Sequence, residues 1–283
     1  MRESAITAVP RGQDRPSIAI RGTPQCVVTN EASLCWREDG HPSGVPVLFL
    51  NSLGTDMRLW DATVLGLPPY FRAIRMDLRG HGLSSGRVRS LTISDLADDA
   101  VAGLDAAGVG TAIIVGLSVG GMVAQDLATR HASRVRAAAL VCTAPRMGTP
   151  ALWNERIEAL SRDGMEPVAD RILERWFAPS FLERPEVAIW RAMLTRTPKE
   201  GYVACCDAIA NVDLTQTVAR IDRSVLAIAG ENDGACPPDE VRAMAEAIPN
   251  ARFSIINGVG HLPCVEDPVS FGHLLHPFLE EHA

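Results

Sequence analysis

The stretch TAIIVGLSVGGMVAQDLATRH, residues 111–131, joins an apolar run to a helical pattern through the sequence GLSVG. Glycine inside a strand or helix costs roughly 0.5–1 kcal/mol relative to alanine, so stability alone does not explain Gly116 and Gly120. In a G-x-S-x-G turn the neighbours of the serine must be small, because the backbone folds closely on itself. The pattern therefore predicts Ser118 as a nucleophile exposed above a sheet, at the amino end of a helix.

Short apolar runs alternate with helical patterns along most of the chain, which predicts a parallel sheet wound with helices. CVVTN and SLCWRED near the amino end indicate an opening antiparallel pair. A helix is expected over TISDLADDAVAGLDAAG, with Ser94 as its N-cap. The later runs, expected to be strands, are VPVLFLN (45–51), FRAIRMD (71–77), TAIIVG (111–116), AAALVCTA (137–144), RSVLAIAGEND (223–233) and ARFSIING (251–258).

Residues 145–215 have helical periodicity and contain no convincing strand. We therefore expect a core of residues 23–144 and 216–283, with residues 145–215 inserted as a helical cap. Ligands of open α/β sheets bind beyond the carboxyl ends of the strands, and this insertion would cover that edge. Residues 1–22 lack the continuous apolar segment of a secretory signal, and we expect them to be a flexible leader.

Composition excludes several classes of function. The net charge of −7 argues against nucleic acid as a partner, and there is no apolar run long enough for a transmembrane helix. The seven cysteines show no metal-ligand spacing, so we expect reduced thiols, no metal and a cytoplasmic protein. Cys205 and Cys206 are expected to be buried. The oligomeric state is left open.

A serine nucleophile needs a base to accept its proton and a third group to hold that base in position. In hydrolases of this type the order along the chain is Ser, then Asp or Glu, then His. Asp233 and His261 each follow a predicted strand, so both are expected at the edge of the sheet where Ser118 lies. Asp233 could otherwise be a turn former, and His261 a loop histidine, but the shared edge favours a catalytic triad.

An oxyanion hole requires two backbone donors, one of them from the residue after the nucleophile, Val119. The other is expected from the loop NSLGTDMRLW, where Leu53 is the candidate. The segment DLRGHG (77–82) also contains an Asp and a His. It precedes the nucleophile, and we interpret it as a glycine-rich turn braced by charge.

Six stretches resemble the 3-oxoadipate enol-lactonases of the α/β-hydrolase superfamily: NSLGTDMRLWD, MDLRGHGLSS, GLSVGGMVAQ, APRMGTPALWNERI, EGYVACCDAI and IAGENDGACPP. The likeness extends from about residue 24 to the end. It implies the α/β-hydrolase fold, with a mostly parallel, doubly wound, eight-stranded sheet, a helical cap and no cofactor. It also implies hydrolysis of 3-oxoadipate enol-lactone through an acyl-enzyme, in the catabolism of aromatic compounds. Val119 stands where relatives often have Met or Leu.

The implied substrate is a small anionic lactone, whose carboxylate needs a cation. Arg146, where the chain enters the cap, is the first candidate, with Arg191 and Arg196 behind it; Trp153 could line an apolar wall. Two alternatives remain open. The same triad could act on another small ester, lactone or carbon–carbon bond, or as a perhydrolase, and the fold could serve a non-catalytic ligand-binding protein.

Overall fold

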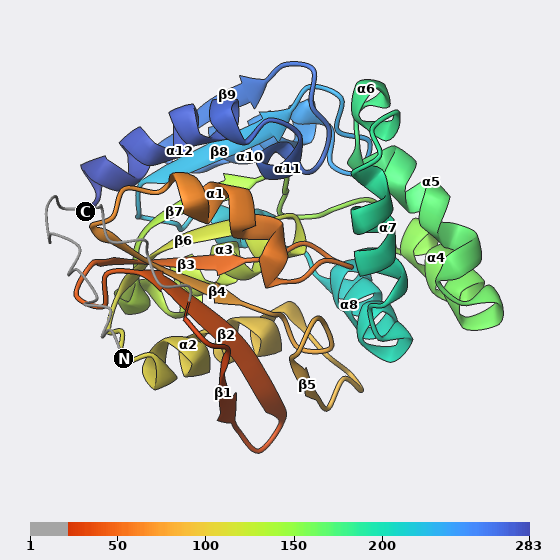
Figure 1. The fold of residues 1–283 in the computed structure, drawn as a ribbon, viewed down its shortest axis with the longest axis horizontal. Helices are drawn as coiled ribbons and strands as arrows, with labels where there is room; N and C mark the ends of the chain where they lie inside the picture. Colours follow the sequence, from red (N-terminus) through yellow and green to blue (C-terminus); the bar gives the residue numbers. More distant parts are fainter. Residues whose placement is uncertain (1–21) are drawn as a thin grey trace, which may run out of the picture.

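A central sheet organises residues 22–283, the part of the chain that the computed structural model describes (Figure 1). Its main path runs β1-β2-β4-β3-β6-β7-β8-β9, with β5 paired to β2. The pairs of β2 with β1, β4 and β5 are antiparallel, and the others are parallel. The strands are β1 (Gln25–Val28), β2 (Ala32–Gly40), β3 (Val45–Leu50), β4 (Phe71–Met76), β5 (Ser85–Gly86), β6 (Ala112–Leu117), β7 (Val135–Val141), β8 (Val225–Gly230) and β9 (Ala251–Ile256).

The predicted mostly parallel, eight-stranded sheet is confirmed, with β5 as a short ninth strand at its edge. Every residue of β6 and of β8 is buried. Both faces of these strands are covered, which explains why their sequences are continuous apolar runs rather than alternating ones. The turn DGHPSG joins β2 to β3. These two strands do not pair with each other, because β4 lies between them in the sheet.

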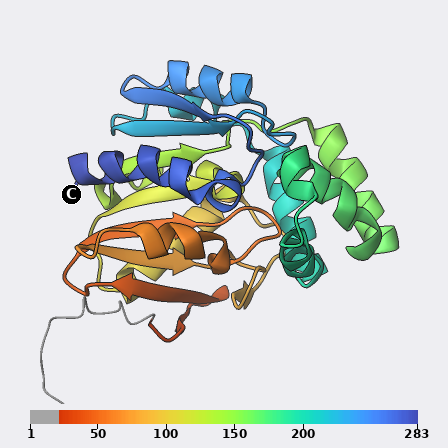
Figure 2. The ribbon, with the colours of Figure 1, turned by 45° about the horizontal axis from the view of Figure 1, so that its top comes forward.

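Helices cover both faces of the sheet (Figures 1 and 2). Helices α1 and α12 pack together on one face, while α2, α3, α9 and α10 follow one another across the other. Their bounds are η1 (Met57–Trp60), α1 (Asp61–Gly66), α2 (Ile93–Ala106), α3 (Val119–Arg130), η2 (Ala132–Arg134), α9 (Thr215–Val218), α10 (Pro238–Ala247), α11 (Pro263–Glu266) and α12 (Pro268–Glu281).

Between β7 and α9 the described chain forms helices joined by loops, contains no strand, and lies beyond the carboxyl ends of the parallel strands (Figure 2). These cap helices are α4 (Pro150–Asp163), α5 (Glu166–Trp176), α6 (Pro179–Leu182), α7 (Val187–Thr195) and α8 (Lys199–Asn211). Of the expected leader, residues 1–21 lie outside the described residues. Gly22 donates its N–H to the carbonyl of Glu38 in β2.

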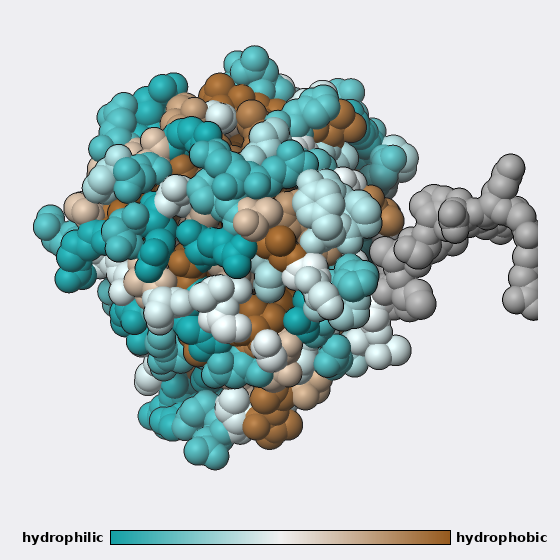
Figure 3. Space-filling model, turned by 90° about the vertical axis from the view of Figure 1, so that its left-hand side faces the viewer, coloured by the Kyte–Doolittle hydropathy of each residue, from teal (hydrophilic) through white to brown (hydrophobic). Residues whose placement is uncertain are grey.

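The end of the sheet opposite the cap presents a largely hydrophilic surface, with hydrophobic residues in small, separate patches (Figure 3). Among the described residues no helix has both the length and the apolar character needed to cross a membrane. All seven cysteines are free, and Cys205 and Cys206 are buried as predicted.

The N-cap of helix α2 lies two residues before the expected one. Thr92, rather than Ser94, is the N-cap residue: its hydroxyl accepts the N–H of Asp95, and the Asp95 carboxylate accepts the N–H of Thr92. This reciprocal pair is a capping box, which satisfies two backbone donors at once. The Ser94 hydroxyl instead donates to Asp126 of α3 at 3.4 Å.

We expect Thr92→Ala to lower the free energy of unfolding by about 1 kcal/mol, because it removes the N-cap acceptor. Urea denaturation followed by circular dichroism measures this change. Ser94→Ala is the matched control and should have the smaller effect. A larger loss from Ser94→Ala would contradict the assignment of the cap.

Candidate active site

The turn at Ser118 is shaped by backbone atoms in close contact. A Cβ atom at Gly116 would lie 2.2 Å from the carbonyl oxygen of Gly120, and one at Gly120 would lie 2.4 Å from that of Leu50. Neither position can therefore hold a larger residue without moving β3 or α3. Ser118 itself has φ +59° and ψ −118°, a conformation that L-residues rarely adopt. The two glycines allow α3 to begin against the ends of β3 and β6.

Ser118 lies at the carboxyl edge of the sheet, directly before the first residue of α3. Its N–H donates to the carbonyl of Val141 at the end of β7. The residue is only 4% exposed, so the prediction of an exposed serine was wrong. The reason is that the cap covers this edge, where its side chains pack against the neighbouring loop after β3. Within residues 22–283 the Ser118 hydroxyl makes no hydrogen bond.

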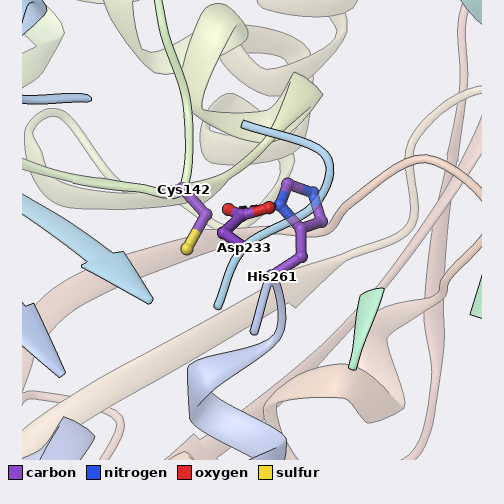
Figure 4. Close-up of side chains that lie close together, drawn as sticks. All are labelled: Cys142, Asp233 and His261. Carbon is purple, nitrogen blue, oxygen red and sulfur yellow. Dashed lines mark hydrogen bonds and ion pairs between the residues drawn. The ribbon is translucent and has the colours of Figure 1, made fainter. Parts of the chain in front are cut away.

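Asp233 and His261 are hydrogen-bonded to each other (Figure 4). The Nδ1 atom of His261 lies 2.8 Å from Oδ2 of Asp233, and both residues are buried. The other carboxylate oxygen of Asp233 accepts the N–H groups of Ala235 and Cys236, at 2.7 and 2.9 Å. These contacts fix the carboxylate and leave Nε2 as the ring nitrogen of His261 available for proton transfer.

Backbone bonds connect Ser118 to this pair across neighbouring strands. Ser118 is bonded to the end of β7, and the next residue of that chain segment, Cys142, donates its N–H to Ile228 of β8. Asp233 follows β8, and His261 follows β9. The structure thus brings the three predicted residues to one edge, each after a different parallel strand.

Cys142 completes the only group of three potential metal-ligating side chains found in the described part of the chain. Its Sγ, a carboxylate oxygen of Asp233 and a ring nitrogen of His261 lie within 4.8 Å of one another (Figure 4). Burial and the negative charge of Asp233 raise the pKa of the Cys142 thiol, which favours its protonated form. The imidazole and carboxylate are already hydrogen-bonded to each other.

The predicted oxyanion donors Leu53 and Val119 have free backbone N–H groups. Neither donates a hydrogen bond to any residue from 22 to 283, although both residues are buried. Val119 is the first residue of α3, where a free N–H is expected and the helix dipole favours negative charge. The loop of Leu53 is held by Asn51, whose side-chain amide donates to the carbonyls of Ser52 and Thr55.

The same loop packs tightly against the cap. At Gly54, which has φ +77°, a Cβ atom would lie 2.7 Å from Leu194 Cδ1 and 2.9 Å from Tyr202 Cε2. Leu194 belongs to α7 and Tyr202 to α8. The cap therefore forms a wall of the site directly beside Leu53.

The acid and histidine of DLRGHG play a different part. The Asp77 carboxylate accepts the N–H groups of Met57 and Leu83, at 2.6 and 2.8 Å, so it joins the start of η1 to its own turn. Burial raises the pKa of Asp77 to about 6. Burial also lowers the pKa of His81 to about 4, so this imidazole is neutral near pH 7. These contacts agree with a braced turn.

The predicted substrate-binding residues lie in different surroundings. Arg146 is half exposed, 3.8 Å from Asp213, and Arg191 is bonded to exposed carboxylates of α5. Arg196 lines a crevice of about 510 Å³ between α7 and the core. The indole N–H of Trp153 donates to the carbonyl of Met147 at 2.6 Å.

Sequence reasoning missed two residues beside the site, Arg156 of α4 and Tyr202 of α8. The hydroxyl of Tyr202 is fully buried and has no hydrogen-bond partner in residues 22–283. Burial raises the pKa of Tyr202, and the facing guanidinium of Arg156 acts in the opposite direction. Arg156 also stacks over the ring of Trp153, 4.9 Å from its centroid. The helical spacing of Trp153 and Arg156 was the available signal, since residues three apart share a helix face.

A family model described as alpha/beta hydrolase fold matches residues 45–268. The protein named 3-oxoadipate enol-lactonase 2 from Acinetobacter baylyi is 30% identical over 249 residues, which cover 87% of this chain and 93% of that protein. These matches confirm the predicted resemblance.

Solved structures agree with this result. The enol-lactonase from Burkholderia xenovorans LB400 aligns with a TM-score of 0.87 at 35% identity, covering 90% of this chain and all of that one. A thermophilic esterase from Thermogutta terrifontis, with malate bound, aligns with a TM-score of 0.85 at 29% identity. That match covers 93% of this chain and 100% of the esterase.

We expect Gly120→Ala to lower the free energy of unfolding by about 2 kcal/mol or more, because the added methyl overlaps the Leu50 carbonyl. Urea denaturation measures the loss. At Gly110 no atom lies within 4 Å of an added Cβ, so Gly110→Ala is the control and should be nearly neutral. Equal stability of the two variants would show that the turn is not tightly packed.

Proposed function

Because the chain belongs to the alpha/beta hydrolase fold family, we propose that it is a serine hydrolase with the catalytic residues Ser118, Asp233 and His261. The observation that carries the proposal is the 2.8 Å hydrogen bond between His261 Nδ1 and Asp233 Oδ2. It lies at the sheet edge that also holds the Ser118 turn. A buried, oriented imidazole beside a serine on such a turn is the arrangement that acyl transfer needs.

In this mechanism Ser118 Oγ attacks the substrate carbonyl while Nε2 of His261 accepts the hydroxyl proton. Asp233 accepts the Nδ1–H, which fixes the tautomer and stabilises the imidazolium that forms. The imidazolium then gives its proton to the leaving oxygen, and an acyl-enzyme remains. Water attacks the acyl carbon as His261 takes one of its protons, and Ser118 leaves with that proton restored.

The negative oxygen of each tetrahedral intermediate requires donors that are already in place. The free N–H groups of Leu53 and Val119 are our candidates. Leu53 lies in the loop after β3, and Val119 lies at the start of α3. These two segments are close to each other beside Ser118, because Gly120 contacts Leu50 and Asn51. Donors fixed by close backbone contact need little reorganisation during the reaction.

We infer that the substrate is 3-oxoadipate enol-lactone, which the enzyme opens to 3-oxoadipate in the catabolism of aromatic compounds. The support is the likeness to enol-lactonases over most of the chain, in sequence and in fold. Opening the lactone ring expels an enol oxygen, which is a better leaving group than an alkoxide. The enol becomes the ketone without further catalysis.

The position of Arg156 supports an anionic substrate. Its guanidinium faces Tyr202, and Tyr202 packs against Gly54 beside the proposed oxyanion donor. Arg156 also lines a groove of about 280 Å³ between α4 and α5, with Arg171 and Arg175. A carboxylate entering this groove would meet positive charge on a protein whose net charge is −7.

Arg156 is preferred to Arg146 and Arg191 because no carboxylate within residues 22–283 neutralises its charge. Among the described residues it forms no ion pair, whereas Arg146 and Arg191 each have a carboxylate partner. The buried Tyr202 hydroxyl adds a second donor next to it. We therefore propose that Arg156 and Tyr202 bind the substrate carboxylate.

Ser118→Ala should abolish hydrolysis of the enol-lactone, followed as loss of its ultraviolet absorbance, because the nucleophile is removed. It should also abolish covalent labelling by a fluorophosphonate. The wild-type protein, assayed in parallel with simple neutral esters, should hydrolyse the lactone with the higher kcat/KM. Labelling without lactone hydrolysis would keep the serine hydrolase and reject the substrate. Unchanged labelling of Ser118→Ala would reject the triad.

Arg156→Gln should lower kcat/KM for the anionic lactone by roughly 10–100-fold, the value of a lost charge-assisted hydrogen bond. Most of the change should appear in KM, and a neutral ester should be affected little. Arg171→Gln is the matched control, because Arg171 lines the same groove without facing Tyr202. Equal losses for both variants, or for both substrates, would contradict the assignment.

A further inference from the structure

The carboxyl end of α5 contacts three of the loops that carry the proposed machinery. The carbonyl of Trp176 accepts the backbone N–H of His261 at 2.7 Å. Arg175 donates its Nε–H to the carbonyl of Gly234, next to Asp233, at 3.0 Å. The ring of Trp176 lies against Gly54 in the oxyanion loop. This end of the cap is therefore joined to the histidine, the aspartate and the oxyanion donors.

Glu266 strengthens the junction between the cap and the histidine loop. Its Oε1 accepts the N–H of Gly260 at 2.7 Å, and its Oε2 accepts the N–H of Ala178 at 3.0 Å. Gly260 directly precedes His261, and Ala178 follows α5 by two residues. The residue is 9% exposed, and one carboxylate holds both backbone segments. Ionised carboxylates make such bonds shorter and stronger than neutral acceptors do.

We propose that Glu266 is a positioning residue that fastens the His261 loop to the cap, so that seating the cap and orienting the imidazole are one event. The inference rests on the serine hydrolase mechanism above, but not on the identity of the substrate. A cap that moves to admit substrate pulls on Ala178 and Trp176, and through them on the backbone of Gly260 and His261. Catalytic geometry is then complete only when the cap is closed.

Both oxygens of Glu266 are strong acceptors only in the ionised form, since in a protonated carboxyl the hydroxyl oxygen carries the proton and accepts more weakly. Burial raises the pKa of Glu266 to about 7, assisted by the charge of Asp233 and opposed by the two N–H groups and by Arg184. The Cys264 thiol of the same helix also faces it. The junction is therefore complete above pH 7 and weakens as the pH falls below it.

The effect on folding has the opposite sign. An acid whose pKa is raised by folding stabilises the native state at low pH, below its usual value of 4.5, and that contribution is lost as the pH rises towards 7. Ionising Glu266 thus completes the junction while it lowers the stability of the fold. For a residue with only a structural role, we expect the junction and the stability of the fold to change in the same direction with pH.

The test compares wild type, Glu266→Gln and Glu266→Asp by the rate of fluorophosphonate inactivation from pH 5.5 to 9. The rate of inactivation depends on Ser118 and His261, whatever the natural substrate of the enzyme is. At pH 8 we expect Glu266→Gln to lose about tenfold, as when a partner that orients a functional histidine is removed. Its amide can accept only one of the two N–H groups. The pH profile of the wild-type rate should show an ionisation near pH 7 that is absent from the profile of Glu266→Gln.

Glu240→Gln is the matched control. The negative charge of Asp233 also raises the pKa of Glu240, but the hydrogen-bond contact of Glu240 is with Cys236 and not with the cap. It should react at the wild-type rate. Equal losses in the two glutamine variants would overturn the proposal in favour of a simple charge effect. A wild-type rate and pH profile for Glu266→Gln would overturn it outright.

Hydrogen exchange supplies a readout that needs no activity. Glu266→Gln and Glu266→Asp should both speed exchange in peptides containing residues 176–178 and 260–262, at pH 8. The shorter aspartate side chain spans one contact only, so it gives the same test if the glutamine variant does not fold. Slow exchange as in wild type would contradict the junction. Absence of fluorophosphonate labelling in wild type would instead reject the proposed hydrolase and leave the exchange result to decide on Glu266.

Discussion

The close approach of α3 to the ends of β3 and β6 is the constraint on which the site depends. Two glycines let these backbones come within contact distance, and the serine between them is forced into a conformation with positive φ. One local arrangement therefore fixes the hydroxyl of Ser118 and the N–H of Val119, and it brings the loop of Leu53 alongside. The entropy cost of the glycines is balanced by a function that no bulkier residue would permit.

The parallel sheet supplies the rest, because it places the residues after β6, β8 and β9 at one edge. Asp233 and His261 need no sequence proximity to Ser118 to meet there. The cap then closes this edge and contacts the loops that it covers, chiefly through the carboxyl end of α5. In the proposed mechanism the core provides Ser118, Asp233 and His261, and the cap provides Arg156 and Tyr202, which we propose bind the substrate carboxylate.

Sequence patterns predicted the features that depend on strand order and local turns. The continuous apolar runs predicted the strands of the sheet. Ser118, Asp233 and His261 each follow such a run, which predicted that they meet at one edge. Burial of Ser118 and the roles proposed for Arg156 and Glu266 depend on how the cap packs against the core; the spacing of Trp153 and Arg156 places them on one helix face but does not give that packing. The N-cap of α2 was misplaced although the sequence carries a signal: Asp95 lies three residues after Thr92, the spacing of a capping box, whereas Ala97 lies three residues after Ser94.

The most direct test is a crystal structure of the protein after reaction with a phosphonate that mimics the tetrahedral intermediate. The account predicts a covalent bond to Ser118 Oγ, with the phosphonyl oxygen about 2.7–3.1 Å from the backbone nitrogens of both Leu53 and Val119. It also predicts Nε2 of His261 within hydrogen-bond distance of the bonded oxygen of Ser118. An adduct on another residue, or a phosphonyl oxygen turned away from both nitrogens, would contradict it.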